Sequence, residues 1–176
     1  KEKKGEERER RGGRERRGEE GEEKSAGVGR WARRWHPHGG NIALSLVLRP
    51  PSDKLQYVVM LAALAVADAV ASVNGLACDI KWPNDVLLDG KKICGILTQS
   101  EHGVAPFTLI GIGVNVNLDA AAFPDIKEIA TSVAAAAGHA VDRAGLLKVL
   151  LEEIERRYVS LDAPETVFGE WRRRPG

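Results

Sequence analysis

A long apolar segment with helical spacing most constrains how this chain can fold. We predict a helix over Asp53 to Ser72, with Ser52 as its N-cap and Asn74-Gly75 at its end. The apolar positions at helical spacing are Leu55, Val58, Val59, Ala62, Val66, Ala69, Val70 and Val73. So few polar positions remain that the helix is expected to be buried on most sides. Its longest apolar run, Val58 to Ala67, ends at Asp68 and falls short of the roughly 20 residues that a membrane helix needs, so no membrane association is expected.

Apolar runs on both sides of this helix predict strands. Residues 41–48 alternate between apolar and other positions, with one side made of Ile and Leu. After the helix, the pattern is strand, turn, strand, turn, strand, and Asp89-Gly90 is a strong hairpin signal within it. The last of these strands is expected over residues 107–116. Gly111 and Gly113 lie inside it, where glycines commonly let a ligand approach the backbone closely.

The rest of the chain is predicted to be helical. Residues 126–137 would form a short alanine-rich helix stopped by Gly138, and Asp142 would cap a second helix. The apolar face of the second helix consists of Leu146, Leu147, Leu150, Leu151, Ile154, Tyr158 and Leu161. Its solvent side is expected to carry Lys148, Glu152, Glu155, Arg156 and Arg157.

Composition separates a charged tail from one domain. Residues 1–24 contain only Lys, Arg, Glu and Gly, and we expect a disordered or marginally helical tail because such a segment has nothing to bury. Residues 25–176 suit one domain, and a formal net charge of +1 provides no global field for a nucleic acid or a membrane. Cys78 and Cys94 lie in separate apolar runs, which predicts reduced, core-packed thiols. With no apolar segment at the amino end, these features favour a cytoplasmic protein.

A lysine at a strand end is the main candidate for chemistry. Lys81 ends an apolar run, Trp82-Pro83 stops the strand, and Asn84-Asp85 supplies turn residues. An ammonium held there is a point charge aimed at a carboxylate or a phosphate. The alternative is a surface lysine before a turn.

Four motifs in order carry a resemblance to a known family. Residues 81–85, Lys-Trp-Pro-Asn-Asp, resemble the signature of biotin protein ligases. Residues 95–97, Gly-Ile-Leu, and residues 111–117, Gly-Ile-Gly-Val-Asn-Val-Asn, follow with that family's order and spacing. Residues 26–35 resemble a degraded form of its glycine-arginine loop. Over residues 22–173 the chain is similar to the catalytic domain of these ligases, which implies an α+β fold. That fold is a mixed β-sheet flanked by helices, shared with lipoate ligases and related to class II aminoacyl-tRNA synthetases.

The resemblance implies a two-step reaction. Biotin would be activated with ATP as biotinyl-5'-adenylate and transferred to a lysine of a biotin carboxyl carrier protein, with Lys81 and Arg30 as the catalytic residues. The biotin-binding residues that it implies are Lys24, Val28, Gly29, Arg30 and Lys81. The nucleotide-binding residues that it implies are Arg30, Arg33, Trp35, Asn84 and Asn115. Mg²⁺ would accompany ATP, and the chain shows no cluster of metal ligands.

Asn115 also has a physical reason to be a candidate. An amide both donates and accepts hydrogen bonds, which suits the edge of an adenine ring. A turn formed with Asn117 is the alternative.

Several positions depart from the family pattern. Val28 and Trp31 stand in place of arginines, Ala32 in place of a glycine, and Lys24 in place of a glutamine that faces the biotin ring. No Ser-Thr-Asn motif precedes the loop. Two alternatives therefore stay open: a ligase of the same fold for lipoate or another small acid, and a catalytically impaired domain that only binds biotin or nucleotide.

The resemblance also implies what would surround this domain. A small β domain would begin after Gly176, and the family's repressors carry a winged-helix domain before the catalytic one. Neither is present in these 176 residues, so no DNA binding is expected. A homodimer is left open.

Overall fold

The computed structural model describes residues 27–28, 34–35, 39–101 and 107–174. The charged segment 1–24 lies outside these ranges, so its expected disorder stays a prediction.

A five-stranded sheet forms one layer of the fold, with strand order β3-β7-β6-β5-β4. The strands are β3 (Ile42–Leu48), β4 (Asp79–Lys81), β5 (Asp85–Leu88), β6 (Lys91–Glu101) and β7 (Phe107–Val114). All four neighbouring pairs are antiparallel, and a single parallel bridge joins Lys92 to Ala130. A separate two-stranded ladder pairs β1 (Gly27–Val28) with β2 (Arg34–Trp35).

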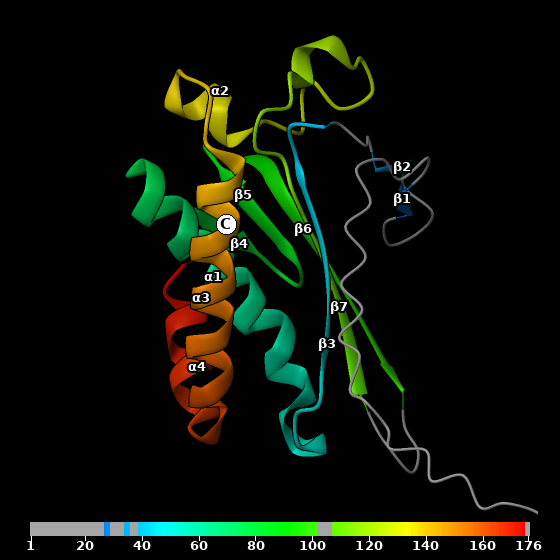
Figure 1. The fold of residues 1–176 in the computed structure, drawn as a ribbon, viewed down its shortest axis with the longest axis vertical. Coiled ribbons are helices and arrows are strands. Elements are labelled where there is room, and N and C mark those ends of the chain that lie inside the picture. Colours follow the sequence, from blue (N-terminus) through cyan, green and yellow to red (C-terminus); the bar gives the residue numbers. More distant parts are fainter. Residues whose placement is uncertain (1–26, 29–33, 36–38, 102–106, 175–176) are drawn as a thin grey trace, which may run out of the picture.

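Helices form the second layer, and three of them cover the same side of the sheet (Figure 1). The helices are α1 (Leu55–Asn74), α2 (Val133–Ala137), α3 (Arg143–Val159) and α4 (Pro164–Arg172). Helix α1 contacts β6 on one side and α3 and α4 on the other. This arrangement confirms the α+β class, with the apolar helix at its centre.

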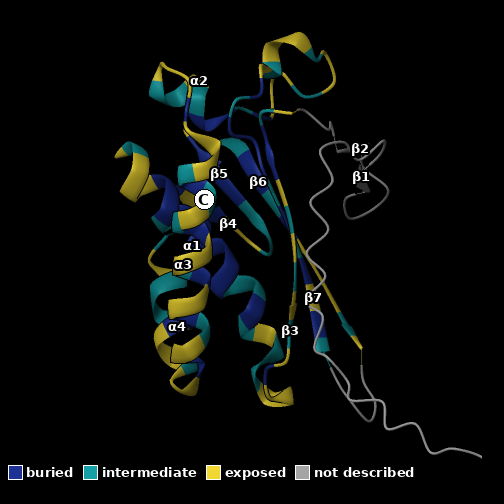
Figure 2. Cartoon of the chain, viewed as in Figure 1, coloured by how far each residue is buried: buried dark blue, intermediate teal, exposed yellow. Residues whose placement is uncertain are grey.

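The core lies between α1 and the sheet, where the buried residues gather (Figure 2). One register row of the sheet supplies Ile80, Val86, Cys94, Val114 and Ile42, all buried. Ten residues of α1 are buried against this row and against α3. The segment of residues 52–74 is long and apolar enough to cross a membrane, although its unbroken apolar run, which ends at Asp68, had predicted that it is too short. In the fold, 56% of the apolar window in this segment is buried, as in the core helix of a folded domain.

The predicted ends of this helix were half right. Gly75 closes α1 in the left-handed conformation at φ 69°, as expected. Ser52 does not cap α1, because a short 3₁₀ turn over Ser52–Lys54 comes first and Lys54 takes the N-cap position without a side-chain hydrogen bond.

The hairpin signal at Asp89-Gly90 is confirmed. Both residues have positive φ, 49° and 75°, and they join β5 to β6. Two left-handed residues in succession match the right-handed twist of the flanking strands.

The predicted helix over residues 126–137 was wrong for most of its length. Only Val133–Ala137 is helical, capped by the Ser132 hydroxyl, which accepts from Ala135 N at 3.2 Å. The preceding backbone bonds to β6 instead: Lys92 N donates to Ile129 O at 2.9 Å and Thr131 N donates to Lys92 O at 3.0 Å. Pairing with a strand outweighed the helix propensity of the local sequence.

Helix α3 begins as expected, with the Asp142 carboxylate accepting from Ala144 N at 3.0 Å. Its surface was predicted wrongly at two positions. Leu151, assigned to the apolar face, is 39% exposed, whereas the Arg157 side chain, assigned to solvent, is only 5% exposed. Arg157 is buried because Asp68 of α1 and Glu170 of α4 both accept hydrogen bonds from it.

Both cysteines are free and buried, which confirms the prediction of core-packed thiols. Burial raises the pKa of Cys78 to about 12, and it also raises the pKa of Cys94 well above the usual range. At pH 8 neither side chain is expected to be a thiolate, the form that reacts with alkylating agents. We therefore expect iodoacetamide to label the native protein far more slowly than the urea-unfolded protein. Equal labelling rates in the two states would contradict this burial.

Candidate functional site

The face of the sheet opposite the helices carries the candidate residues. Directly opposite residues of paired strands point to the same face. The register therefore places one row on this open face: Lys81, Asp85, Gly95, Gly113 and Ala43. Gly95 and Gly113 lie side by side at the centre of the row, so no Cβ covers the backbone there, and another group can approach it closely.

Lys81 ends β4 at one edge of this row, as the sequence predicted. It is exposed, and two strand spacings put its backbone about 10 Å from Gly95. Trp82, the next residue along the chain, is 71% exposed. Among the described residues, no carboxylate forms an ion pair with the Lys81 ammonium, so this cation is available to a ligand.

A second cation reaches the open face closer to the glycines. The register shifts between Val86 and Leu87, and bulges of this kind commonly re-aim a side chain. Lys92 Nζ lies 2.6 Å from Asp85 Oδ1, and it lies 3.1 Å from where a Cβ on Gly95 would be. The ammonium of Lys92 thus lies over Gly95, and a side chain at that position would require Lys92 to shift by a few tenths of an ångström.

Asn84 fixes the turn that separates Lys81 from Asp85. Its amide nitrogen donates to Ile96 O at 2.8 Å, and Ile96 N donates back to Asn84 O at 2.9 Å. This pair of bonds anchors the turn on β6. The predicted contact of Asn84 with a nucleotide remains a prediction, and its amide nitrogen already has this structural partner.

Asn115 follows β7 and is connected to Lys92 through one loop segment. Its amide nitrogen donates to Thr131 O at 3.1 Å, and Thr131 N donates to Lys92 O at 3.0 Å. The Asn115 amide oxygen accepts no hydrogen bond from a described residue. Asn117 binds elsewhere, since its side chain exchanges two hydrogen bonds with the backbone of Val141. The two asparagine side chains therefore bind separate segments of the chain, and the alternative of a turn between them stays open.

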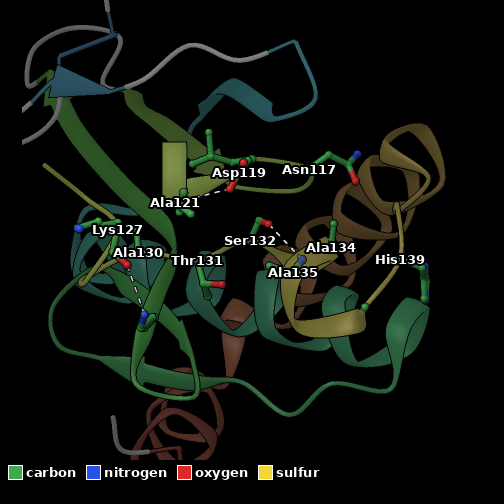
Figure 3. Close-up of a pocket in the computed structure, with 14 residues that line it drawn as sticks. Asn117, Asp119, Ala121, Lys127, Ala130, Thr131, Ser132, Ala134, Ala135 and His139 are labelled. Carbon is green, nitrogen blue, oxygen red and sulfur yellow. Dashed lines mark hydrogen bonds between the residues drawn. The ribbon is translucent and has the colours of Figure 1, made fainter. Parts of the chain in front are cut away.

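A cavity of about 560 Å³ lies beyond β7, beside this loop segment (Figure 3). Lys127, Ala130 and Thr131 lie on one side of it and Ala134, Ala135 and His139 on another. Its lining includes none of Lys81, Asp85, Lys92 or Asn115. Lys81 and Lys92 therefore lie on the open face of the sheet and outside this cavity.

The glycine-arginine loop is described only in part. Lys24, Gly29, Arg30 and Arg33 lie outside the described residues, so their predicted contacts with biotin and nucleotide stay predictions. Val28 and Trp35 are described as main chain only, in β1 and β2, where Gly27 pairs with Trp35 and Val28 with Arg34.

Lys92 and the carboxylate of Asp85 were not singled out from the sequence. The available signal was the hairpin itself: Lys91-Lys92 begins the strand that pairs with the one Asp85 starts. Counting along the strand does not predict the bulge that brings Lys92 to Asp85, because the side chain would otherwise be assigned by simple alternation.

Metal binding by the protein alone has no support in the described ranges, where no group of three His, Cys, Asp or Glu side chains could hold an ion. Asp85 is a carboxylate on the open face. Mg²⁺ commonly uses one or two protein carboxylates together with substrate phosphates and water, so this donor set fits an ion brought in by a nucleotide.

Comparison with known proteins agrees with the geometry. The family model described as biotin/lipoate A/B protein ligase matches residues 20–117. The chain is 46% identical over 143 residues to a bifunctional ligase/repressor BirA of Bacillus spizizenii, covering 78% of this chain and 44% of that protein. It is 40% identical over 152 residues to a biotin–[acetyl-CoA-carboxylase] ligase of Paracoccus denitrificans, covering 80% of this chain and 62% of that protein.

The fold has counterparts among solved structures. A biotin protein ligase from Aquifex aeolicus, solved in complex with biotin and ATP, superposes with a TM-score of 0.65 at 29% identity, covering 77% of this chain and 56% of that one. The chain thus spans about half the length of the relatives that it matches. Since the family model covers the glycine-arginine loop and both strands of the glycine pair, and the fold agrees with it, this chain belongs to the biotin/lipoate A/B protein ligase family.

Proposed function

We propose that this chain is the catalytic domain of a biotin protein ligase. The observation that carries the proposal is the open face, where two lysine side chains, a carboxylate and a glycine pair share one register row and its adjoining bulge. Relatives named biotin ligases and a structural neighbour that holds biotin and ATP support biotin as the acid.

The chemistry that we propose has two steps. In the first, a biotin carboxylate oxygen bonds to the α-phosphorus of ATP, and the bond to the β-phosphate bridging oxygen breaks to release pyrophosphate. In the second, the amine of a carrier-protein lysine bonds to the biotinyl carbonyl carbon and loses a proton, and AMP leaves with the electrons of the broken C–O bond. Both steps build negative charge between carboxyl and phosphoryl oxygens, where fixed cations stabilise the transition state most.

Each residue has a proposed part. Lys92 and Lys81 neutralise the developing charge, Lys92 over the glycine pair and Lys81 at the end of the row. The Asn115 amide oxygen accepts from the exocyclic amine of adenine, while its nitrogen stays bonded to Thr131. Mg²⁺ enters with ATP and neutralises the triphosphate. Arg30 contributes the arginine contact to the adenylate that the family resemblance implies.

The first test is pyrophosphate exchange. We expect the purified chain to incorporate labelled pyrophosphate into ATP when biotin is present, and to do so much more slowly with lipoate or without an acid. Exchange with lipoate alone would support the lipoate alternative. Thermal stabilisation by biotin and ATP without exchange would indicate a binding domain that has lost its chemistry.

The second step needs its own assay. We expect a biotin carboxyl carrier domain to become reactive with streptavidin when it is incubated with the chain, biotin and Mg-ATP. A carrier domain whose acceptor lysine is changed to arginine is the matched control. Adenylate formation without transfer would restrict the proposal to the first step.

A further inference from the structure

A buried charge cluster joins three helices behind the sheet. Asp68 of α1 accepts hydrogen bonds from Arg157 of α3 and from Arg174, which follows α4, the latter at 2.6 Å. Arg157 also donates to Glu170 of α4 at 2.8 Å. The Arg157 side chain is only 5% exposed, and that of Asp68 is 21% exposed. Glu170 and Arg174 are each 35% exposed, so solvent screens the Arg157–Asp68 pair least, and together the pairs hold the end of α4 against α1.

The backbone of Arg174 makes a separate contact with the sheet. Ile80 N donates to Arg174 O at 3.0 Å. Ile80 is the central residue of β4, the three-residue strand at the edge of the sheet, and its other side pairs with Val86. Lys81 is the next residue. Arg174 therefore makes two contacts: its backbone oxygen accepts a hydrogen bond from the outer side of β4, and its guanidinium binds Asp68.

We propose that Arg174 is a positioning residue for Lys81. Its guanidinium, held by Asp68, keeps its carbonyl oxygen on Ile80, and this bond fixes the strand end from which Lys81 projects. The proposal rests on the proposed function of Lys81. A short edge strand has few other restraints on that side, and misplacement of a catalytic group by about 1 Å can reduce a rate by about 10²-fold.

Hydrogen exchange tests the mechanical step without any activity. In Arg174→Ala we expect the Ile80 amide to exchange at least about tenfold faster by NMR than in the unchanged chain, because its acceptor is no longer held. Arg173→Ala is the matched control, since this neighbouring side chain is exposed and should leave Ile80 unaffected. Arg174→Lys, which retains a cation for Asp68, should restore part of the protection. Unchanged exchange of Ile80 in Arg174→Ala would overturn the proposal.

Kinetics test the link to Lys81. We expect Arg174→Ala to lower kcat for adenylate formation by about tenfold and to change KM for biotin by less than about twofold, since the loss falls on positioning. In a Lys81→Ala background the same substitution should cause no further loss in kcat. An equal loss in both backgrounds would overturn the proposal, because general destabilisation would act regardless of Lys81. Should the chain catalyse no exchange, Ile80 protection would still decide the role of Arg174, so the two failures are distinguishable.

Discussion

Replacement of Lys92 by alanine is expected to slow biotin-dependent pyrophosphate exchange by at least about 10²-fold, the scale for loss of one transition-state charge contact. Lys92 Nζ lies over Gly95 and 2.6 Å from Asp85, so alanine removes a cation and leaves an unpaired carboxylate at the proposed binding position of anionic substrates. The same loss of at least about 10²-fold is expected for Lys81→Ala. Exchange rates at saturating biotin and ATP measure both effects.

Lys91→Ala is the matched control for these two variants. Lys91 neighbours Lys92, but its ammonium donates to Lys127 O at an exposed position away from the open face. We expect exchange within about twofold of the unchanged chain and little change in thermal stability, since exposed pairs contribute about 0–1 kcal/mol. Near-normal exchange by a folded Lys92→Ala variant would remove Lys92 from the mechanism, and the same result for Lys81→Ala would remove Lys81.

The largest loss of stability is expected from Arg157→Ala. Removing one partner of a buried ion pair typically costs about 3–5 kcal/mol, because the charges left behind stay desolvated. Here Asp68 and Glu170 would both lose a hydrogen-bonded cation, although Arg174 still reaches Asp68. Urea unfolding followed by circular dichroism measures the difference in the free energy of unfolding.

Arg156→Ala provides the control for this substitution. Arg156 is adjacent on α3, but its side chain is 56% exposed; it lies 2.5 Å from Glu153 but 3.8 Å from Asp68, so it adds little to the buried pairs. We expect a loss below about 1 kcal/mol. An Arg157→Ala protein as stable as Arg156→Ala would show that the buried cluster contributes little.

The stability difference should also depend on pH. Burial acts to raise the pKa of Asp68, but hydrogen bonds from Arg157 and Arg174 outweigh it, so the pKa lies below its usual value of 3.8. A carboxyl whose pKa is lowered by folding stabilises the folded state above its unfolded pKa, and this contribution is lost as pH falls through the folded pKa. The advantage of the unchanged chain over Arg157→Ala is therefore expected to be complete above pH 5 and to shrink below about pH 4. A difference that stays constant from pH 6 to pH 3 would contradict this.

Local patterns predicted most of the layered fold. Helix α1, the Asp89-Gly90 hairpin and the Asp142 cap each depend on residues close in the sequence, and each formed where expected. The family motifs identified the α+β class before any long-range contact was known. Each of these features is determined by residues close to one another in the sequence, so it can be predicted from one sequence.

The errors occurred where distant segments compete with local preference. Residues 126–132 have helical composition, yet they form turns, and Ile129 and Thr131 bond to the backbone of Lys92 on β6. Arg157 was predicted to face solvent, but it is buried because it donates hydrogen bonds to Asp68 and Glu170, which lie 89 and 13 positions away in the sequence. The periodicity of apolar residues in a sequence does not reveal partners that are distant along the chain.

The candidate site was predicted in part for the same reason. Lys81 lies on the same face of the sheet as Gly95 and Gly113, and of these two glycines only Gly113 was a candidate from its strand position. Lys92 was missed because the direction of its side chain depends on the β-bulge in the neighbouring strand. Asn84 lies in the predicted turn, and its side chain also anchors that turn on β6. The remaining predicted contacts belong to the loop of residues 24–38, most of which lies outside the described ranges.

The pairing of Asp85 with Lys92 gives the open face an internal counter-ion. The Lys92 ammonium and the Asp85 carboxylate lie 2.6 Å apart, and their side chains are 34% and 24% exposed, so each is the other's resident counter-ion on this face. An acid that bound at Lys92, as the proposed function requires, would have to compete with this one carboxylate for the ammonium. Under that proposal, substrate binding would exchange one anionic partner of Lys92 for another instead of neutralising a free cation.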